Sequence, residues 1–477
     1  MNESRTTLQR STLIASSLAV VVVMFNVAAV NPALPALQRT LQIAPTDVPW
    51  AVNVYNIVYA AFLLVGGLLG ARLGFRRTLL AGLTVGAAGA LLAALAPSFN
   101  AVLLGRGISG LSSALVQPAS LVLLTLAFTE PAARARAIGL WAGVSGLGIA
   151  IGPVLGGVLV DAFGWTSVFW TLALASLTVG WIARRGTRPT AALPAKPIDL
   201  TGLILITFTL AALIYGLTQG NGLGWTSPAV LACLTGAGIA FTLFVWVQRH
   251  VQAPLVPLNL FRNPAYTAAN LGGLVVFFGP FSLLVFFTIL LQGVLHFTAT
   301  RAGLITALFP LGTALGSTLG GRLTARRGER LTATLGLSLT GLGILLLTGI
   351  TLTMNGWDLW WKFALMGLGV GLSLGALTTA AMASAPQDQL SQASSVLNAL
   401  RQVGVALGVA TLGAVIARHP GGSGSAFLFG LRDALWLAGT ALLVGAPALW
   451  WAMGRTTWTG PARPPHHPVQ DLTATEP

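Results

Sequence analysis

Residues that could carry a charge or a proton are few in this sequence, and their placement is uneven. Only 8% of the 477 residues are charged. The eleven carboxylates all lie in short polar stretches, near the termini, or at the ends of long apolar stretches. Two arginines, Arg106 and Arg401, instead lie inside apolar stretches. No carboxylate pair, metal-ligand cluster or nucleophile with a neighbouring base is evident, so we predict no enzyme activity, no metal site and no cofactor.

Arg106 is the strongest candidate for a functional residue. An arginine in the membrane interior costs about 2.5–3.5 kcal/mol on insertion scales, so it usually lines a cavity or meets a partner. The other interpretation is that its guanidinium snorkels to the outer membrane surface. For Arg401 the snorkelling interpretation is about as good, although Asn398 and Gln402 could form a polar face with it.

Amide and aromatic side chains lie in the same apolar stretches and are candidates for contacting a small molecule. A cavity rich in such groups and poor in charge suits neutral or apolar molecules, and Arg106 would also admit an anionic group. Phenylalanines between residues 277 and 287 could contribute, although most of them are expected to face lipid or to pack. The candidates for substrate or coupling contacts are Asn26, Asn31, Asn53, Tyr55, Tyr59, Arg106, Gln117, Asn398, Arg401 and Gln402, with Asn56 beside them.

The apolar stretches themselves predict a membrane protein. The chain is 55% hydrophobic, whereas a soluble domain carries about 25% charged residues. A membrane-spanning helix needs about 20 mainly apolar residues. We therefore predict an all-α integral membrane protein with about fourteen transmembrane helices, near residues 12–34, 50–71, 78–96, 101–127, 137–160, 166–183, 200–219, 228–247, 266–291, 302–323, 331–353, 359–384, 394–417 and 433–453.

The basic residues predict the orientation of these helices. The net charge is +15, and the basic residues lie mainly in short loops. With the N-terminus in the cytoplasm, nineteen lysines and arginines face the cytoplasm and five face outward, which follows the positive-inside rule. We predict an N-in, C-in, multi-pass protein of the cell membrane, with the lipid bilayer and not nucleic acid as its partner. The proline-rich residues 456–477 predict a disordered cytoplasmic tail.

An internal repeat divides the predicted helices. Residues 67–76 and 321–330 share Gly, Leu, Ala, Arg, Gly and Arg at the same six of ten positions. The segments are eight helices apart, whereas a parallel repeat of six-helix halves would place them six apart. We therefore predict a six-helix bundle over residues 1–190, two linking transmembrane helices over 191–258, and a second six-helix bundle over 259–455. The alternative is chance, since basic glycine-containing loops are common on the cytoplasmic side.

Four segments together resemble the major facilitator superfamily, specifically its fourteen-helix drug:proton antiporter branch. Residues 67–76 are similar to the family's loop motif after the second helix, and residues 104–118 to its fourth-helix motif with a buried arginine. Residues 146–157 resemble the fifth-helix antiporter motif, the most specific match, and residues 25–35 resemble the first-helix motif. The resemblance implies a secondary transporter that exports small amphipathic or hydrophobic compounds by alternating access, as in multidrug efflux, with protons as the coupling ion.

The sequence departs from that family where a proton would be carried. The resemblance places aspartates where Asn26 and Ala71 stand, and Ala325 occupies the matching position of the second repeat. An amide does not titrate in this range, so Asn26 cannot carry a proton. Asp161, at the outer end of the predicted fifth helix, is the nearest remaining carboxylate.

Glycines and basic residues are candidates for packing and gating. Gly148, Gly152 and Gly156 form a stripe along which another helix can approach closely, and Pro153 predicts a bend. We expect this contact to slide during transport, with static packing as the alternative; for the similar stripe at residues 312, 316 and 320 the two interpretations are nearly equal. The loop residues either brace a cytoplasmic gate or only enforce topology, and they are Gly67, Arg72, Gly74, Arg76, Gly321, Arg326 and Gly328.

The sequence as a whole predicts a monomeric transporter of a small molecule. An uncoupled facilitator and an importer of a specific metabolite are alternatives within transport. A membrane sensor that does not transport is a third, and the missing carboxylates would suit it.

Overall fold

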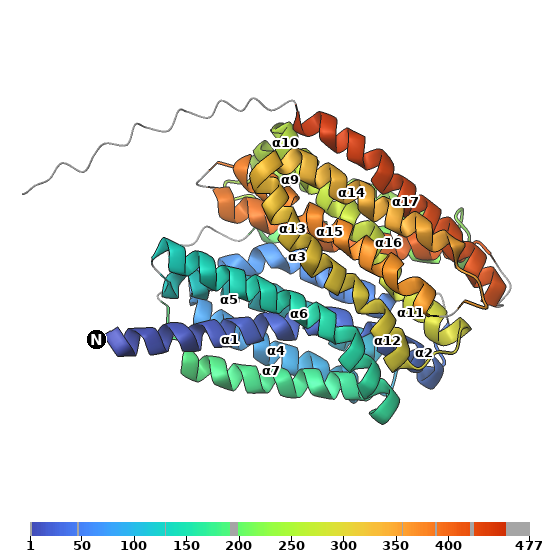
Figure 1. Ribbon diagram of the computed structural model, residues 1–477, viewed down its shortest axis with the longest axis horizontal. Coiled ribbons are helices and arrows are strands. Elements are labelled where there is room, and N and C mark those ends of the chain that lie inside the picture. Colours follow the sequence, from blue (N-terminus) through green and yellow to red (C-terminus); the bar gives the residue numbers. More distant parts are fainter. Residues whose placement is uncertain are drawn as a thin grey trace, which may run out of the picture.

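The protein is helical throughout the part of the chain that the structure describes (Figure 1). The computed structural model describes residues 2–44, 47–128, 130–190, 199–354, 356–386, 389–419 and 424–454. The predicted tail at 456–477 lies outside the described residues. Along the chain the elements are α1 (Asn2–Ala29), η1 (Asn31–Ala33), α2 (Leu34–Leu41), α3 (Trp50–Leu73), α4 (Phe75–Ala94), α5 (Phe99–Ala127), α6 (Pro131–Phe163), α7 (Thr166–Gly186), α8 (Leu200–Leu223), α9 (Pro228–His250), η2 (Leu258–Arg262), α10 (Pro264–Val276), η3 (Phe277–Phe281), α11 (Ser282–Ile289), η4 (Leu290–Val294), α12 (Ala299–Thr306), α13 (Leu308–Arg327), α14 (Glu329–Leu346), η5 (Leu347–Gly349), α15 (Trp357–Ala383), α16 (Leu390–Ile416) and α17 (Gly424–Met453).

The number of membrane-spanning helices agrees with the prediction. Among the described residues, thirteen helices are long and apolar enough to cross a membrane, and α3 makes a fourteenth when its two parts, bent by 52°, are taken as one span. Individual boundaries differ from the prediction. The last helix begins at Gly424 and not near residue 433, because its first turns carry Arg432 and Asp433 and are therefore too polar to register as an apolar stretch.

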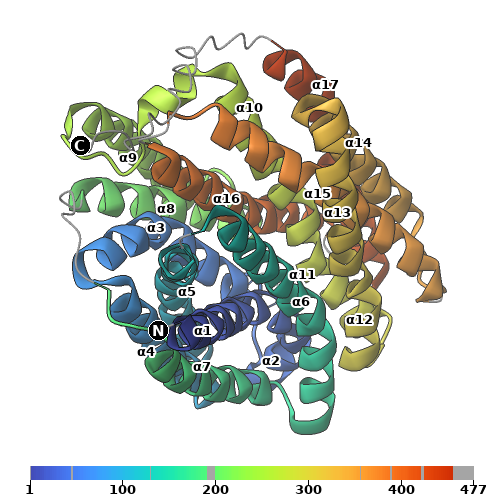
Figure 2. The same cartoon turned by 60° about the vertical axis from the view of Figure 1, so that its left-hand side comes forward.

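The helices form two groups with a helix pair beside them. Figure 2 shows α1 to α7 gathered on one side and α10 to α17 on the other. Helices α8 and α9 pack on each other, and α8 also contacts α3 and α16, one helix from each group. The start of α1 and the end of α17 lie at the same end of the molecule (Figure 1), as an N-in, C-in chain requires. We call the opposite end, predicted to face away from the cytoplasm, the outer end.

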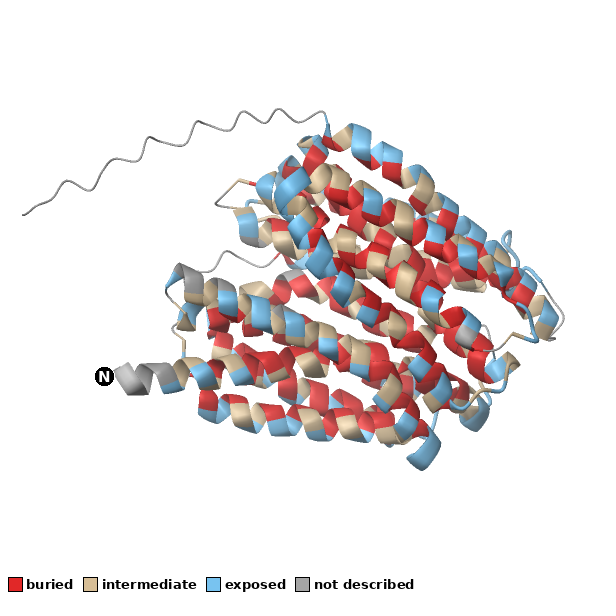
Figure 3. Ribbon diagram, viewed as in Figure 1, coloured by how far each residue is buried: buried red, intermediate tan, exposed pale blue. Residues whose placement is uncertain are grey.

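Large apolar side chains cover the outward faces of the helices. Exposed and buried residues alternate along the outer helices (Figure 3). The exposed fraction is 62% for Leu174, 67% for Ile204 and 71% for Val444. Such a surface would be unfavourable in water and is suited to lipid, so the molecule is a multi-pass membrane protein.

The span over Pro264–Val294 is irregular where the sequence has Gly279-Pro280. A widened π-helical turn occupies Phe277–Phe281, and a second one occupies Leu290–Val294. Pro280 lacks the N–H that a regular helix would use, so the helix changes its hydrogen bonding there. The first irregular turn places Phe277 and Phe281 in parallel stacking, with ring centroids 4.3 Å apart.

The glycine stripe of α6 lies directly against α1. A Cβ at Gly152 would be 2.6 Å from the Cβ of Ala28, and one at Gly156 would be 2.6 Å from the Ala29 carbonyl oxygen. Gly148 contacts Met24 in the same way. The stripe at residues 312, 316 and 320 lies similarly against α15. Both stripes are therefore sites of close helix contact.

The two repeat segments have matching backbone geometry. Gly74 and Gly328 both have positive φ, 89° and 85°, at the break between two helices. Arg76 donates to the carbonyl of Arg184 at the end of α7, and its counterpart Arg330 donates to the carbonyl of Trp450 near the end of α17. Each arginine thus binds the C-terminal end of the last helix in its own group, where a cation is favourable.

The first glycines of the two repeat segments lie in open space. Nothing lies within 4 Å of the Cβ position at Gly67 or Gly321, whereas Gly66 lies against the Ala114 carbonyl. Close helix contact on α3 is therefore made by Gly66 and not by Gly67. Arg72 and Arg326 are exposed at the ends of α3 and α13.

Candidate functional site

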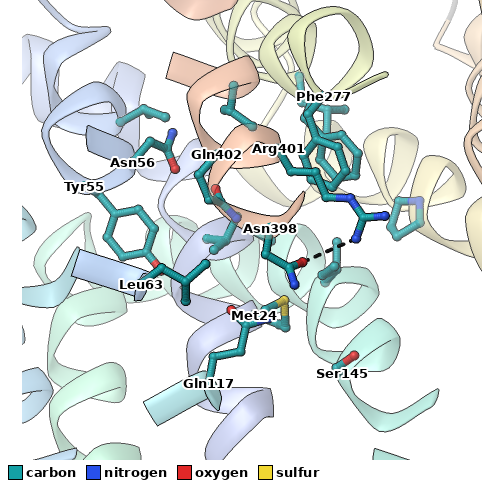
Figure 4. Close-up of a pocket in the computed structure, with 18 of the residues that line it drawn as sticks. Met24, Tyr55, Asn56, Leu63, Gln117, Ser145, Phe277, Asn398, Arg401 and Gln402 are labelled. Atoms are coloured by element: carbon teal, nitrogen blue, oxygen red, sulfur yellow. Dashed lines mark hydrogen bonds between the residues drawn. The ribbon is translucent and has the colours of Figure 1, made fainter. Parts of the chain in front are cut away.

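A cavity of about 600 Å³ lies between the two helix groups. Helices α1, α3, α5 and α6 line one side, and η3, α11, α12, α13, α15 and α16 line the other. The lining is mainly apolar, with amides and hydroxyls at intervals. Figure 4 shows polar side chains of α3, α5 and α16 converging on this space.

Most of the predicted contact residues line this cavity. They are Asn31, Tyr55, Arg106, Gln117, Asn398, Arg401 and Gln402, together with Asn56, Phe277 and Phe281. Asn26, Asn53 and Tyr59 lie behind the lining, with exposed fractions of 7%, 0% and 0%. The structure therefore brings residues 300 positions apart in the chain to one site.

Arg106 is buried at the wall of the cavity, with an exposed fraction of 1%. Its Nε donates to the Ala51 carbonyl at 2.8 Å, and its Nη1 donates to Oδ1 of Asn26 at 2.5 Å. Its guanidinium carbon lies 4.4 Å from the centre of the Tyr55 ring. The side chain therefore does not snorkel: it bridges α5 to α1 and α3 through neutral oxygens.

Two tyrosines of α3 extend this polar wall along α5. Tyr55 Oη donates to Ser113 Oγ at 2.7 Å, and Tyr59 Oη donates to Oε1 of Gln117. The two tyrosine rings meet edge to face at 5.6 Å. These contacts fix the orientation of Gln117, whose side chain lines the cavity.

Arg401 provides a second guanidinium, from α16. Its Nη1 donates to Asn398 Oδ1 at 3.3 Å and its Nη2 to Thr378 Oγ1 at 2.8 Å. Its guanidinium carbon lies 5.7 Å from the centre of the Phe277 ring. Figure 4 shows Arg401 beside Asn398, Gln402 and Phe277. Arg401 is half-buried in the lining, so it too is a cavity residue and not a snorkelling one.

Several lining residues of α6 were not among the predicted contacts. Trp141, Ser145 and Ile149 line the cavity, and so does Pro153, which was predicted only as a bend. They recur every four residues, next to the glycine stripe, so the spacing places them on one helix face. This periodicity was the signal available in the sequence. Small hydroxyl residues on the opposite side, such as Thr306 and Ser394, carry no comparable signal.

Carboxylates are absent from the described lining, and Asp161 lies elsewhere. At the outer end of α6, its two carboxylate oxygens accept from the backbone N–H groups of Ala299 at 3.0 Å and Thr300 at 2.7 Å. These are the first residues of α12, whose backbone N–H groups have no acceptor within the helix and therefore favour an anion. Asp161 therefore joins the two helix groups beyond the cavity.

Comparison with known proteins identifies relatives along nearly the whole chain. The Major Facilitator Superfamily model matches residues 16–409 and 269–474. The chain is 33% identical over 414 residues to the multidrug resistance protein Stp of Mycobacterium tuberculosis (strain CDC 1551 / Oshkosh), covering 86% of this chain and 76% of that protein. It is 31% identical over 438 residues to the methylenomycin A resistance protein of Bacillus subtilis (strain 168), covering 90% and 92%.

Solved structures share the fold. The crystal structure of a POT family transporter in complex with 5-aminolevulinic acid superposes with a TM-score of 0.68 at 16% identity, covering 92% of this chain and 96% of that one. At this identity the likeness concerns the arrangement of helices alone.

Proposed function

Because this chain belongs to the major facilitator superfamily of membrane transporters, we propose that it is a secondary active transporter that exports small amphipathic or hydrophobic compounds. It is a multi-pass protein of the plasma membrane and not an enzyme. The observation that carries the proposal is the cavity between the helix groups, apolar over most of its wall with a few converging polar groups. Such a site suits molecules that have an apolar body and one or two polar atoms. The relatives named for drug resistance support export as the direction.

Alternating access is supported by the placement of contacts between the two groups. At the outer end, Asp161 binds the start of α12, and Gln292 Nε2 donates to the Pro32 carbonyl at 3.1 Å. Gly157 of α6 lies against the Ala299 carbonyl, and Gly303 of α12 lies against the Pro153 carbonyl. The outer end is therefore closed by close backbone contact. The lining reaches Leu390 and Ser394 at the start of α16, at the predicted cytoplasmic end.

The proposed driving force is a proton gradient, and the candidate coupling group is Asp161. This carboxylate is the ionisable group seen to join the two helix groups at the outer end. Gaining a proton removes its charge and weakens its acceptance from the α12 N–H groups. Protonation from outside would therefore favour opening of the outer end.

Reconstitution in liposomes tests the function directly. The purified full chain is incorporated, a pH gradient is imposed, and the flux of ethidium, Hoechst 33342, rhodamine 6G and fluorescein is followed. Flux that reverses with the gradient supports a proton antiporter. Flux that ignores the gradient favours the facilitator, and flux into the compartment equivalent to the cytoplasm favours the importer. No flux of any compound would contradict transport and favour a sensor.

A further inference from the structure

We propose that the cavity is built for aromatic or apolar compounds that carry an anionic group, that Arg401 recognises this group, and that the charge of Arg106 adds to its attraction. The proposal rests on the transport function proposed above and specifies its substrate class. It follows from the charge of the cavity, from the donors left free on Arg401 and from the aromatic surface beside them.

The described cavity lining is positively charged. Arg106 comes from one helix group and Arg401 from the other, and the described lining holds no Asp or Glu. Both guanidiniums bind neutral oxygens only, those of Asn26, Ala51, Asn398 and Thr378. Their charges are therefore uncompensated within the described part of the chain. A cationic compound would be repelled in such a low-dielectric space, and an anionic compound would be attracted.

Arg401 has donor capacity left for a ligand. A guanidinium carries five N–H donors in a planar fork. Nη1 and Nη2 each make one bond, the first of them long at 3.3 Å. Nε is buried and has no hydrogen-bond partner among the described residues. Nη1 and Nη2 carry two N–H donors each and make one bond each, so each keeps one N–H that a carboxylate oxygen of a bound compound would accept.

An aromatic surface lies next to this donor. Phe277 stacks on Phe281 with an angle of 7° between the rings, and Arg401 lies over Phe277. Both phenylalanines line the cavity, as does Trp141 on the opposite wall. Gln117, Asn398 and Gln402 supply neutral polar groups in the same lining (Figure 4). The combination of a fork donor and flat apolar rings suits an aromatic carboxylate.

Binding of three matched compounds tests the proposal. They are 1-naphthaleneacetate, its neutral amide 1-naphthaleneacetamide, and 2-(1-naphthyl)ethylammonium. Equilibrium dialysis with the purified full chain in detergent gives each Kd at pH 7. We expect the carboxylate to bind about tenfold or more tightly than the amide, because a hydrogen bond to a charged group contributes about 1.5–3 kcal/mol. The ammonium compound is expected to bind most weakly.

Three variants separate charge recognition from general damage. Arg401→Gln should bring the Kd of the carboxylate close to that of the amide and leave the amide unchanged. Arg401→Lys keeps the charge without the fork, so it should retain a smaller preference for the carboxylate. Arg327→Gln removes one positive charge at an exposed position at the end of α13, and should leave all three Kd values unchanged. If the Arg401→Gln variant yields no folded protein, the test is the wild-type preference for the carboxylate over the amide and the reduction of that preference in Arg401→Lys.

The outcomes distinguish this proposal from the one on which it rests. Equal or tighter binding of the ammonium compound would overturn it, as would an Arg401→Gln variant that weakens carboxylate and amide equally. Efflux from liposomes without any charge preference in binding would contradict anion recognition and leave the exporter standing. A clear carboxylate preference without flux would contradict the exporter and leave the binding site standing.

Discussion

Arg106 and Asn26 make the contact at which this chain differs most clearly from the antiporters that it resembles. The resemblance places an aspartate at position 26, and the structure places Asn26 Oδ1 2.5 Å from Arg106 Nη1. An aspartate there would form a buried ion pair whose charge depends on a proton. The amide keeps the hydrogen bond and leaves the positive charge on Arg106 unbalanced. Under the proton coupling that we propose, an amide at this position therefore removes a candidate proton carrier and leaves the cavity wall more positive.

Asn26→Asp should introduce pH dependence into transport. The new carboxylate would pair with Arg106 when ionised and release it when protonated, so the charge of the cavity wall would change with pH. We expect the efflux rate to vary by about tenfold or more between pH 5.5 and 8, since a buried pair is worth more than 1.4 kcal/mol. The measurement is the initial rate in proteoliposomes as a function of pH. Asn100→Asp, an exposed position in the first turn of α5, is the matched control; an equal response in both variants would sink the assignment.

Arg106→Ala should abolish transport without loss of expression. Removing the guanidinium leaves the Ala51 carbonyl and the Asn26 amide without their partner and opens a void beside Tyr55. We expect less than about a tenth of the wild-type flux, since removing a group that holds three helices in register costs several kcal/mol. Arg327→Ala is the control for loss of a positive charge. Full activity of Arg106→Ala in the liposome assay would leave this residue with a structural role only.

Sequence reasoning located the charged and amide residues of the cavity because they are rare in apolar helices. Arg106, Gln117, Asn398, Arg401 and Gln402 are conspicuous there, and all five line the cavity. Tyr59 and Asn53 are both fully buried behind the lining, Tyr59 with its hydroxyl bound to Gln117 of α5, and only the helix packing decides this. Serines and threonines were missed because their hydroxyls commonly bond to their own helix, as Thr306 does to Ala302.

At the scale of the helix, close packing at glycine is what holds α6 between the two helix groups. One face of α6 lies against α1 through Gly152 and Gly156, and the adjacent face lies against α12 through Gly157. In lipid, such contacts rely on close backbone approach and not on hydrophobic burial. Adding one methyl group at such a contact should therefore lower the stability of the protein.

Gly156→Ala should destabilise the protein. The added methyl group would lie 2.6 Å from the Ala29 carbonyl oxygen, so α1 and α6 must separate. We expect a loss of about 1–3 kcal/mol, the usual cost of overpacking. Gly146→Ala on the same helix is the control, because nothing lies within 4 Å of its Cβ position. The measurement is the thermal unfolding midpoint in detergent, and equal midpoints for the two variants would contradict this account of the stripe.

The length and low charge of the apolar stretches made the helices predictable, whereas the division of the helices into bundles depends on the internal repeat. Each span must be apolar for about 20 residues, so thirteen or fourteen spans follow from composition alone. We propose the division into six, two and six helices from the repeat, and it is supported by the equivalent contacts of Arg76 and Arg330. The bend in α3 was not predicted, because no proline marks it.

At the scale of the whole molecule, the closed outer end and the central cavity correspond to one state of the alternating-access cycle that we propose. The contacts of Asp161 with Ala299 and Thr300 must break for the outer end to open. A carboxylate at a helix N-terminus is stabilised by its charge as well as by its hydrogen bonds. The charge on Asp161 should therefore set how much of the population is open to the outside.

Asp161→Asn should shift the protein toward the outward-open state. The amide loses the charge and one of the two acceptor oxygens, which costs about 1.4 kcal/mol or more and raises the open-to-closed ratio about tenfold. Lowering the pH below about 4, the ordinary pKa of an aspartate, should have the same effect on the wild type, because protonation removes the charge, and no effect on the asparagine variant. Both results can be measured as the distribution of distances between two spin labels. The labels are attached at Phe163→Cys on α6 and at Leu352→Cys before α15, and Cys233→Ser removes the native cysteine. Phe163 and Leu352 are 75% and 45% exposed, so labels there leave the packing intact.

The control for this shift is a second outer carboxylate. Oδ2 of Asp433 lies 2.8 Å from Nε2 of His419. Both residues belong to the same helix group. Asp433→Asn therefore removes a similar charge without touching the contact between the groups. A long-distance population that grows in Asp161→Asn and not in Asp433→Asn would locate the coupling of charge to opening at the end of α6. Identical distributions in all three proteins would mean that the outer end is held by the glycine contacts and the Gln292–Pro32 hydrogen bond, and would contradict the coupling role proposed for Asp161.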